Sequence, residues 1–193
     1  MFRFAIVVSV LACGIAQAGE ILTNPGFESG DLAPWTNDTR YDVGGGTPWA
    51  ITGTNCHSGN FCAVNIGNIA LEQTFDPVAV SSVTGISFWA AHPNDSAAPM
   101  AVDFFYAGGG DDELLLSATS TEWSFFDVFA NLRSTGSLTG IEVFGYYGET
   151  GVSVTRLDDL SVTTSTGVPE PASFGLLFGG LSTVVIAARR RLA

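Results

Sequence analysis

Lysine is absent from this 193-residue chain, and basic residues of any kind are few. Four of the seven arginines are Arg3 and residues 189–191, so the body from 19 to 167 has 18 acidic residues against three arginines, a formal charge of −15. Such a charge keeps exported proteins apart in solution. It also repels phosphate backbones and anionic headgroups, so it excludes nucleic acid as a partner and leaves cations and neutral glycans.

Catalytic signatures are missing as well. The chain has two histidines, His57 and His92, each in a turn-like setting. It contains no G-x-S-x-G elbow, no H-E-x-x-H helix and no phosphate-binding glycine loop. Paired carboxylates for glycoside hydrolysis occur by chance in any acidic protein, so a secreted hydrolase is the last-ranked alternative. The sequence predicts that the protein is not an enzyme.

The first 18 residues have the three parts of a secretory signal peptide. Arg3 supplies the positive end, residues 4–15 the apolar core, and Ala16-Gln17-Ala18 the cleavage site. A weak lipobox ending at Cys13 is the minor alternative. We expect cleavage after Ala18 and export of the rest.

Export bears on the cysteines, because disulfides form in oxidising compartments. Cys13 leaves with the signal peptide, and Cys56 and Cys62 remain. Between them Ser-Gly-Asn can turn the chain. The C-x₅-C spacing is poor for zinc, and His57 is the only further ligand nearby. The sequence therefore predicts a disulfide that closes a short loop.

The body is predicted to be all-β. Runs of β-branched and aromatic residues recur between Gly, Asn, Asp, Ser and Pro clusters. Alternation places Val102 and Phe104 on one face opposite Asp103, and Ile141 opposite Glu142. Many short strands in one domain indicate a two-sheet β-sandwich over residues 19–163. The expected strands span 61–66, 69–75, 84–91, 101–106, 113–119, 124–132, 140–147 and 156–163.

The C-terminal segment has a different character. A polar linker, 164–168, precedes Pro169-Glu170-Pro171, an uncharged run over 172–188, and then Arg189-Arg190-Arg191. Seventeen uncharged residues make a helix of roughly 25 Å. That is at the short end of what spans a bilayer, with the arginines on the cytoplasmic side. The sequence predicts one transmembrane helix in 169–193.

These three parts, in this order, resemble the PEP-CTERM sorting signal. In that family a membrane protease, the exosortase, recognises the tail, and Gram-negative bacteria that make exopolysaccharide deliver the protein to the surface or matrix. The resemblance implies an exosortase-like partner, a transient anchor in the inner membrane and a final place at the cell surface or in the extracellular matrix. An ordinary single-span tail anchor is the alternative.

Three stretches of the body resemble the β-jelly-roll modules of the carbohydrate-binding, galactose-binding-like superfamily. They are residues 22–30 followed by Trp35, residues 57–63, and residues 157–162. The resemblance implies a jelly-roll form of the sandwich.

The same resemblance implies a structural calcium ion held by Glu28 and Asp158, with Asn24 as a helper. Alternation also assigns Asp158 to the face of Leu160 and Val162, the expected core face, where a carboxylate needs a cation. Oxygen ligands from separate segments suit calcium. The alternative is that Asp158 pairs with an arginine or caps a turn.

Three functions remain at this point. The first is a structural or adhesive protein of the exopolysaccharide-associated matrix, and the second is a glycan-binding module. For the second, Trp49 and Trp35 are the expected stacking platforms, Trp49 first because the glycines at 44–46 and Pro48 indicate a loop there. Trp89, inside an apolar strand, is expected in the core. The third is the hydrolase. Two exposed tryptophans side by side would favour binding, and a close acid pair in a cleft would favour hydrolysis.

Overall fold

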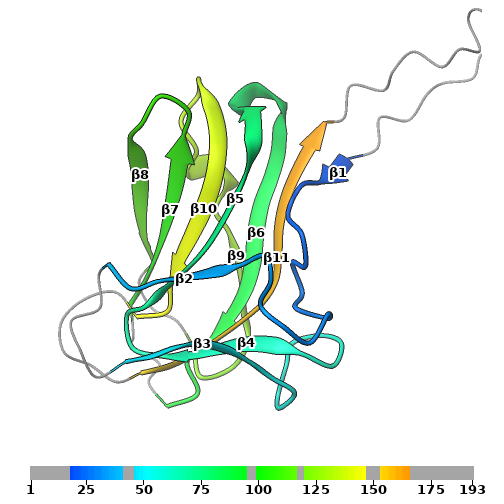
Figure 1. Ribbon diagram of the computed structural model, residues 1–193, viewed down its shortest axis with the longest axis vertical. Coiled ribbons are helices and arrows are strands. Elements are labelled where there is room, and N and C mark those ends of the chain that lie inside the picture. The colour runs from blue at the N-terminus through cyan, green and yellow to red at the C-terminus, as the bar shows by residue number, and fades with distance from the viewer. Residues whose placement is uncertain (1–17, 41–45, 95–98, 117–119, 147–152, 166–193) are drawn as a thin grey trace, which may run out of the picture. The chain divides into compact units, whose positions relative to one another are not determined.

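The computed structural model describes residues 18–40, 46–94, 99–116, 120–146 and 153–165. Residues 18–165 form one compact unit, built in its described part from strands and two short 3₁₀ turns (Figure 1). The strands are β1 (Ala18–Glu20), β2 (Thr36–Asp38), β3 (Thr47–Thr52), β4 (Cys62–Ile66), β5 (Ala70–Ala79), β6 (Val83–Ala91), β7 (Met100–Tyr106), β8 (Asp111–Leu116), β9 (Ser124–Asp127), β10 (Ser137–Phe144) and β11 (Val154–Ser165). The turns are η1 (Val80–Ser82) and η2 (Phe129–Asn131).

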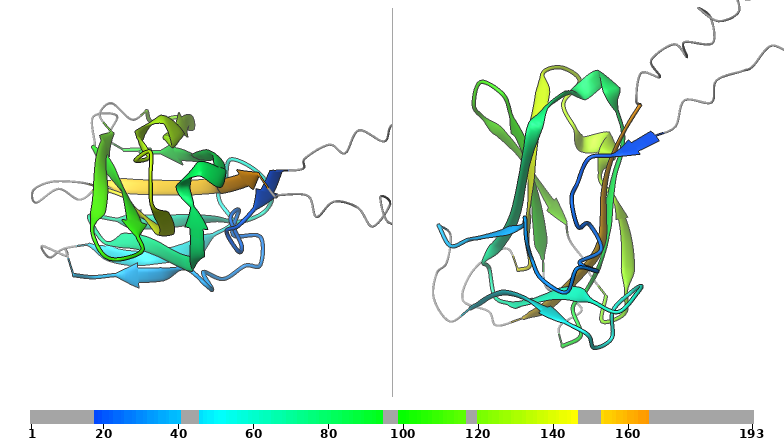
Figure 2. Two further views of the ribbon diagram at one scale, coloured as in Figure 1. Left: turned by 90° about the horizontal axis from the view of Figure 1, so that it is seen from above. Right: turned by 45° about the vertical axis from the view of Figure 1, so that its right-hand side comes forward.

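The strands make two antiparallel sheets that pack as layers (Figure 2). The six-stranded sheet has the order β3-β4-β11-β6-β9, with β1 paired to β11. The five-stranded sheet has the order β2-β5-β10-β7-β8. The turn η1 carries the chain from β5 in one sheet to β6 in the other. This arrangement confirms the predicted all-β, two-sheet sandwich.

The hydrophobic core lies between the sheets, where every second residue of each strand points inward. Phe104 on β7 and Ile141 on β10 come from the five-stranded sheet, and Ile86 and Phe88 on β6 come from the six-stranded sheet. The ring of Phe88 stacks on that of Phe126 at 5.2 Å. Burial of each large side chain contributes roughly 1.5–3 kcal/mol. The residues between these core positions therefore face outward.

All eight expected strands are present, with shifted ends, and three strands were missed. Strand β1 begins at the expected cleavage site, and β2 is three polar residues long. Strand β3 contains Pro48, which indicated a loop in the sequence. Its edge position explains the tolerance, because a proline there withholds no hydrogen bond from a central ladder.

The targeting segments lie apart from this description. Residues 1–17 and 166–193 are outside the described residues, and with them Pro169, Glu170, Pro171, Arg189, Arg190 and Arg191. Within the described ranges, no helix has both the length and the apolar character needed to cross a membrane.

Candidate functional site

The predicted disulfide is present and closes a short loop over the outer face of the six-stranded sheet. Cys56 and Cys62 are bonded, with their Cα atoms 5.3 Å apart. We call residues 56–62 the disulfide loop. Its backbone N–H groups donate to two acidic side chains from distant parts of the chain, so Glu28 and Asp158 contact the same loop.

Backbone amides of the disulfide loop satisfy both carboxylates. The N–H groups of His57 and Ser58 each donate to Asp158 Oδ2 at 3.1 Å. Those of Asn60 and Phe61 donate to the carboxylate of Glu28 at 2.9–3.0 Å. The loop depends on close approach here, since a Cβ at position 59 would collide with that carboxylate.

The two carboxyl groups differ in their electrostatics. The N–H groups of Phe61 and Asn60 lower the pKa of Glu28, which is exposed. Burial raises the pKa of Asp158 to about 6, against the opposing effect of the Ser58 N–H. Asp158 is fully buried. A buried carboxylate with three N–H donors, including that of Asp159 at 2.8 Å, can remain charged at neutral pH.

The reason for burial differs from the expected one. Leu157 and Leu160 both lie in the core, and a register shift separates Asp158 from Ser161 in the pairing with β6. Asp159 takes a left-handed φ of 49° within this bulge. Asp158 is therefore paired with Trp89 on the outer side, and the disulfide loop covers it. Bulges break the alternation from which its facing was predicted.

The side chain of Asn24, the expected helper of the calcium site, forms hydrogen bonds within the loop before β2. Its amide nitrogen donates to the carbonyls of Asp31 and Ala33 at 2.9 and 3.2 Å, and its Oδ1 accepts the N–H of Ser29 at 3.3 Å. All of these contacts stay within the loop before β2. The side chain of Asn24 therefore links the two ends of this loop.

An aromatic cluster lies beside the disulfide loop. It consists of His57, Trp89, Trp123 and Phe125. The imidazole of His57 stacks on Trp89 at 3.8 Å and meets Trp123 edge-on at 5.7 Å, while Phe125 lies 5.4 Å from Trp89. Trp89 and Trp123 are half-buried, and Phe125 is 55% exposed. Two tryptophans thus stand on one outer face around a histidine.

Asp159 holds the histidine of the cluster in place. Its Oδ2 lies 2.7 Å from His57 Nδ1, and its Oδ1 accepts the hydroxyl of Ser58 at 2.8 Å. The indole N–H of Trp123 donates to the carbonyl of Asn55 at 3.2 Å. Since the loop and both tryptophans are tied by these contacts, the cluster is pre-organised.

The two tryptophans nominated as platforms are buried instead. Trp49 is 2% exposed, and its indole N–H donates to the carbonyl of Ile69 at 2.7 Å. Trp35 is 4% exposed and donates to the carbonyl of Asn24 at 3.1 Å. Both belong to the hydrophobic core, so neither presents a ring to solvent. The expected exposure is corrected: both rings lie in the core, whereas Trp89, which was expected there, is half-buried on the outer face.

The outer face of the five-stranded sheet has the opposite chemistry. We call Asp38, Glu72, Asp103, Glu113 and Glu142 the acidic face. Glu142 on β10 is paired with Glu72 on β5 and with Asp103 on β7, and Asp103 is paired with Glu113 on β8. Carboxylates therefore run across four adjacent strands, a repulsive arrangement for like charges.

Asp103 and Glu142 of the acidic face are buried although they point away from the core, and Asp38 beside them is 9% exposed. Glu142 is fully buried and Asp103 is 4% exposed. Burial raises the pKa of Asp103 to about 7, with Glu113 and Asp111 adding to the effect. Burial also raises the pKa of Glu142 to about 8, and the protonated form can donate a hydrogen bond to Asp38.

Arg40 places a positive charge beside the acidic face. Its guanidinium bonds to Asp38 and lies 4.0 Å from Glu142 Oε1. Burial by itself would raise the pKa of Asp38, but the hydrogen bonds from Arg40 lower this pKa overall.

The carboxyl oxygens of Asp38, Glu72 and Glu142 lie within 4.8 Å of one another. Glycosidases that retain configuration separate their carboxyl groups by about 5–5.5 Å around the sugar, and a fully buried Glu142 leaves no such room.

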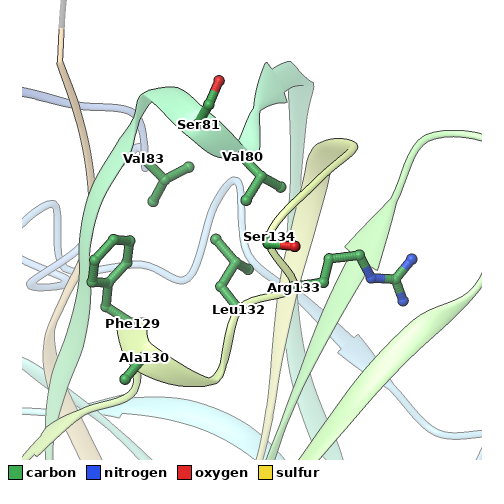
Figure 3. A pocket seen from close by; sticks show the side chains of 8 residues that line it. All are labelled: Val80, Ser81, Val83, Phe129, Ala130, Leu132, Arg133 and Ser134. Carbon is green, nitrogen blue, oxygen red and sulfur yellow. The ribbon is translucent and has the colours of Figure 1, made fainter.

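A recess between η1 and η2 shares no residue with the aromatic cluster or the acidic face. Its volume is about 330 Å³ (Figure 3). Arg133 points away, donating to Asp112 at 2.6 and 2.8 Å and lying over the ring of Tyr106 at 3.5 Å. The lining residues are Val80, Ser81, Val83, Phe129, Ala130, Leu132, Arg133 and Ser134.

No family model and no curated protein sequence matches the chain. Its fold is similar to that of solved carbohydrate-binding modules. A CBM22-1 xylan-binding domain from Paenibacillus barcinonensis Xyn10C superposes with a TM-score of 0.57 at 14% identity, covering 80% of this chain and 100% of that one. TmCBM61 in complex with β-1,4-galactotriose gives 0.53 at 20% identity, covering 76% and 99%. A family 16 carbohydrate-binding module gives 0.52 at 14% identity, covering 74% and 98%. At these identities the likeness establishes a shared jelly-roll-like fold.

Proposed function

We propose that the protein is an exported matrix or surface protein whose sandwich binds neutral glycans through the aromatic cluster. The observation that carries this proposal is the exposed ring of Phe125 beside Trp89 and Trp123, around a histidine fixed by Asp159. Sugar rings present flat C–H faces that pack on aromatic side chains. Exposed aromatic groups of this kind are typical of binding surfaces.

The charge of the chain narrows the ligand class. The body carries a formal charge of −15, so anionic polymers are repelled and neutral ones are not. The solved neighbours include a xylan-binding domain and a module holding a β-1,4-galactotriose. We take neutral, β-linked polysaccharides of these types as the first ligands to test.

The test is affinity electrophoresis of the full chain in gels that contain xylan, β-1,4-galactan or no polysaccharide. We expect retardation by a neutral polysaccharide, reduced by Phe125→Ala and by Trp123→Ala. Phe129→Ala is the matched control, because Phe129 is 38% exposed and lies at η2, outside the aromatic cluster. Equal retardation of all four proteins would overturn the proposal, as would no retardation in a panel of neutral glycans.

Delivery of the protein is proposed from its ends. The signal peptide sends the chain across the inner membrane, and the PEP-CTERM-like tail anchors it there until an exosortase-like protease releases it to the surface or matrix. Replacing Glu170 with alanine should leave the protein in the inner membrane, as measured by fractionation and mass spectrometry of the C-terminus. Unchanged release of the variant contradicts this part of the proposal.

Calcium at Glu28 and Asp158 is retained as a proposal. The convergence of the two carboxylates on one loop supports it, as does the full burial of Asp158. Backbone carbonyls would have to complete a shell of 6–8 oxygens. A chelator should then lower the melting temperature by several degrees, since about 1 kcal/mol corresponds to roughly 2–4 °C in a domain of this size.

The carboxyl oxygens of Asp38, Glu72 and Glu142 also lie close enough together to hold a cation. The chelator experiment is therefore done with Glu142→Gln protein, which lacks one of these carboxylates. In Glu142→Gln protein the drop should persist, and adding Asp158→Asn should abolish it. If the melting temperature of the Glu142→Gln protein is the same with and without chelator, Glu28 and Asp158 hold no stabilising ion.

A further inference from the structure

The acidic face contains a compact set of oxygen donors that glycan binding does not use. Asp38, Glu72 and Glu142 come from β2, β5 and β10, which are adjacent strands. Their carboxyl oxygens lie within 4.8 Å of one another. Each side chain projects from a hydrogen-bonded sheet, so these donors are held on a rigid support rather than on a loop.

A second observation distinguishes this set from an ordinary acidic patch. Glu142 is fully buried, and in the described part of the chain no N–H or hydroxyl group donates to either of its carboxyl oxygens. Oδ1 of the neighbouring Asp103, which is 4% exposed, likewise has no donor there. Buried polar atoms are normally hydrogen-bonded or paired with an opposite charge. These carboxyl oxygens therefore require either a bound proton or a bound cation.

Arg40 supplies only part of the compensating charge. Its guanidinium bonds to Asp38 but stays 4.0 Å from Glu142, and its side chain is 63% exposed. One arginine therefore faces three carboxylates, with Asp103 and Glu113 behind them on β7 and β8. The carboxyl group of Glu142 is fully buried, so solvent does not compensate it.

We propose that Asp38, Glu72 and Glu142 bind a divalent cation, with calcium the preferred ion, on the outer face of the five-stranded sheet. The donor set is entirely oxygen, without histidine or cysteine, which selects hard cations over zinc or copper. Calcium is favoured over magnesium because it accepts irregular geometry and bidentate carboxylates. Asp38 can serve while bonded to Arg40, since each carboxylate has about four lone-pair positions.

This site is independent of the aromatic cluster, which lies on the other sheet. It is also distinct from the calcium proposed at Glu28 and Asp158, where backbone N–H groups already occupy the carboxylate oxygens. A cation here would offset the repulsion among the three carboxylates.

Isothermal calorimetry with calcium chloride alone tests the proposal on the full chain, stripped of metal beforehand. Glu142→Gln should weaken one binding event at least about tenfold, because even loss of a second-shell partner lowers metal affinity 10–100-fold. Glu113→Gln is the matched control: it makes the same chemical change on the same face, at an exposed position on β8. It should change the affinity less than about twofold, since a screened exposed charge contributes little.

Asp158→Asn separates the two calcium sites, because it should leave the event that Glu142→Gln weakens. The proposal is overturned if Glu142→Gln binds calcium with wild-type affinity and stoichiometry, or if wild-type protein binds none. A metal-free thermal melt checks folding: Glu142→Gln should melt no lower than wild type. No glycan is present, so failure here is separate from failure of the glycan proposal.

Discussion

The two outer faces of the sandwich each bury a carboxyl group outside the core, and they treat it in opposite ways. On the six-stranded sheet, Asp158 accepts three backbone N–H groups, two of them from the disulfide loop that covers it. On the five-stranded sheet, Glu142 accepts none from the described residues and faces other carboxylates. Equal burial of the same chemical group therefore has two different energetic meanings.

The difference lies in whether the backbone supplies hydrogen-bond donors to the buried carboxyl group. Donated N–H bonds stabilise the charged form of Asp158 and fix the disulfide loop, and through Asp159 they fix the histidine of the aromatic cluster. Glu142 lacks such donors, so a proton or a cation must compensate it. The same acid-to-amide substitution should distinguish the two.

Asp158→Asn should have the largest effect on stability. Either the N–H group of Asp159 or the two N–H groups of the disulfide loop then meet the amide NH₂ of the new side chain instead of an acceptor. An unsatisfied buried group costs about 1–3 kcal/mol, and the loss of charge assistance adds to this. Urea unfolding in the presence of a chelator measures the effect free of metal. A loss below about 0.5 kcal/mol, the range of ordinary surface substitutions, would mean that these bonds do not hold the loop.

Glu142→Gln should have the opposite sign under the same conditions. The amide removes a buried acid group that resists ionisation, and its NH₂ can still donate to Asp38 as the protonated acid does. We expect the free energy of unfolding at pH 8 to rise by on the order of 1 kcal/mol. Glu113→Gln, on the exposed edge of the same face, should change it by less. Destabilisation by Glu142→Gln similar to that of Asp158→Asn would remove the contrast between the faces.

Local patterns in the sequence were sufficient for much of the fold. Alternation placed Ile141 and Glu142 on opposite faces, and turn residues between two cysteines predicted the disulfide. The convergence of Glu28 and Asp158 was also expected. Each of these depends on residues close in sequence or on motifs with a known spatial relation.

Contacts that depend on the order of the strands in each sheet could not be predicted from the sequence. The contact of His57 with Trp89 requires β11 to lie between β4 and β6, and the meeting of Asp38 with Glu142 requires the missed strand β2 beside β5. Pro48 made the region of Trp49 resemble a loop. Trp49 is the one fully buried side chain of the six-residue strand β3, so the sequence there shows no alternation. Sheet order supplies the information that alternation lacks.

The pH dependence of stability tests the acidic face without any substitution. Burial raises the pKa of Asp103 from 3.8 in the unfolded chain to about 7 in the folded one, so the folded state holds a proton that the unfolded state has lost. Stability from this group is complete below pH 3.8 and declines as the pH rises toward 7. Asp158 and Glu142 shift in the same direction, to about 6 and about 8. Without metal, the free energy of unfolding should therefore fall between pH 5 and pH 8, and Asp103→Asn should flatten only part of the decline. A wild-type curve that rises with pH over this range would mean that the acidic face is charged and compensated without a proton or a cation.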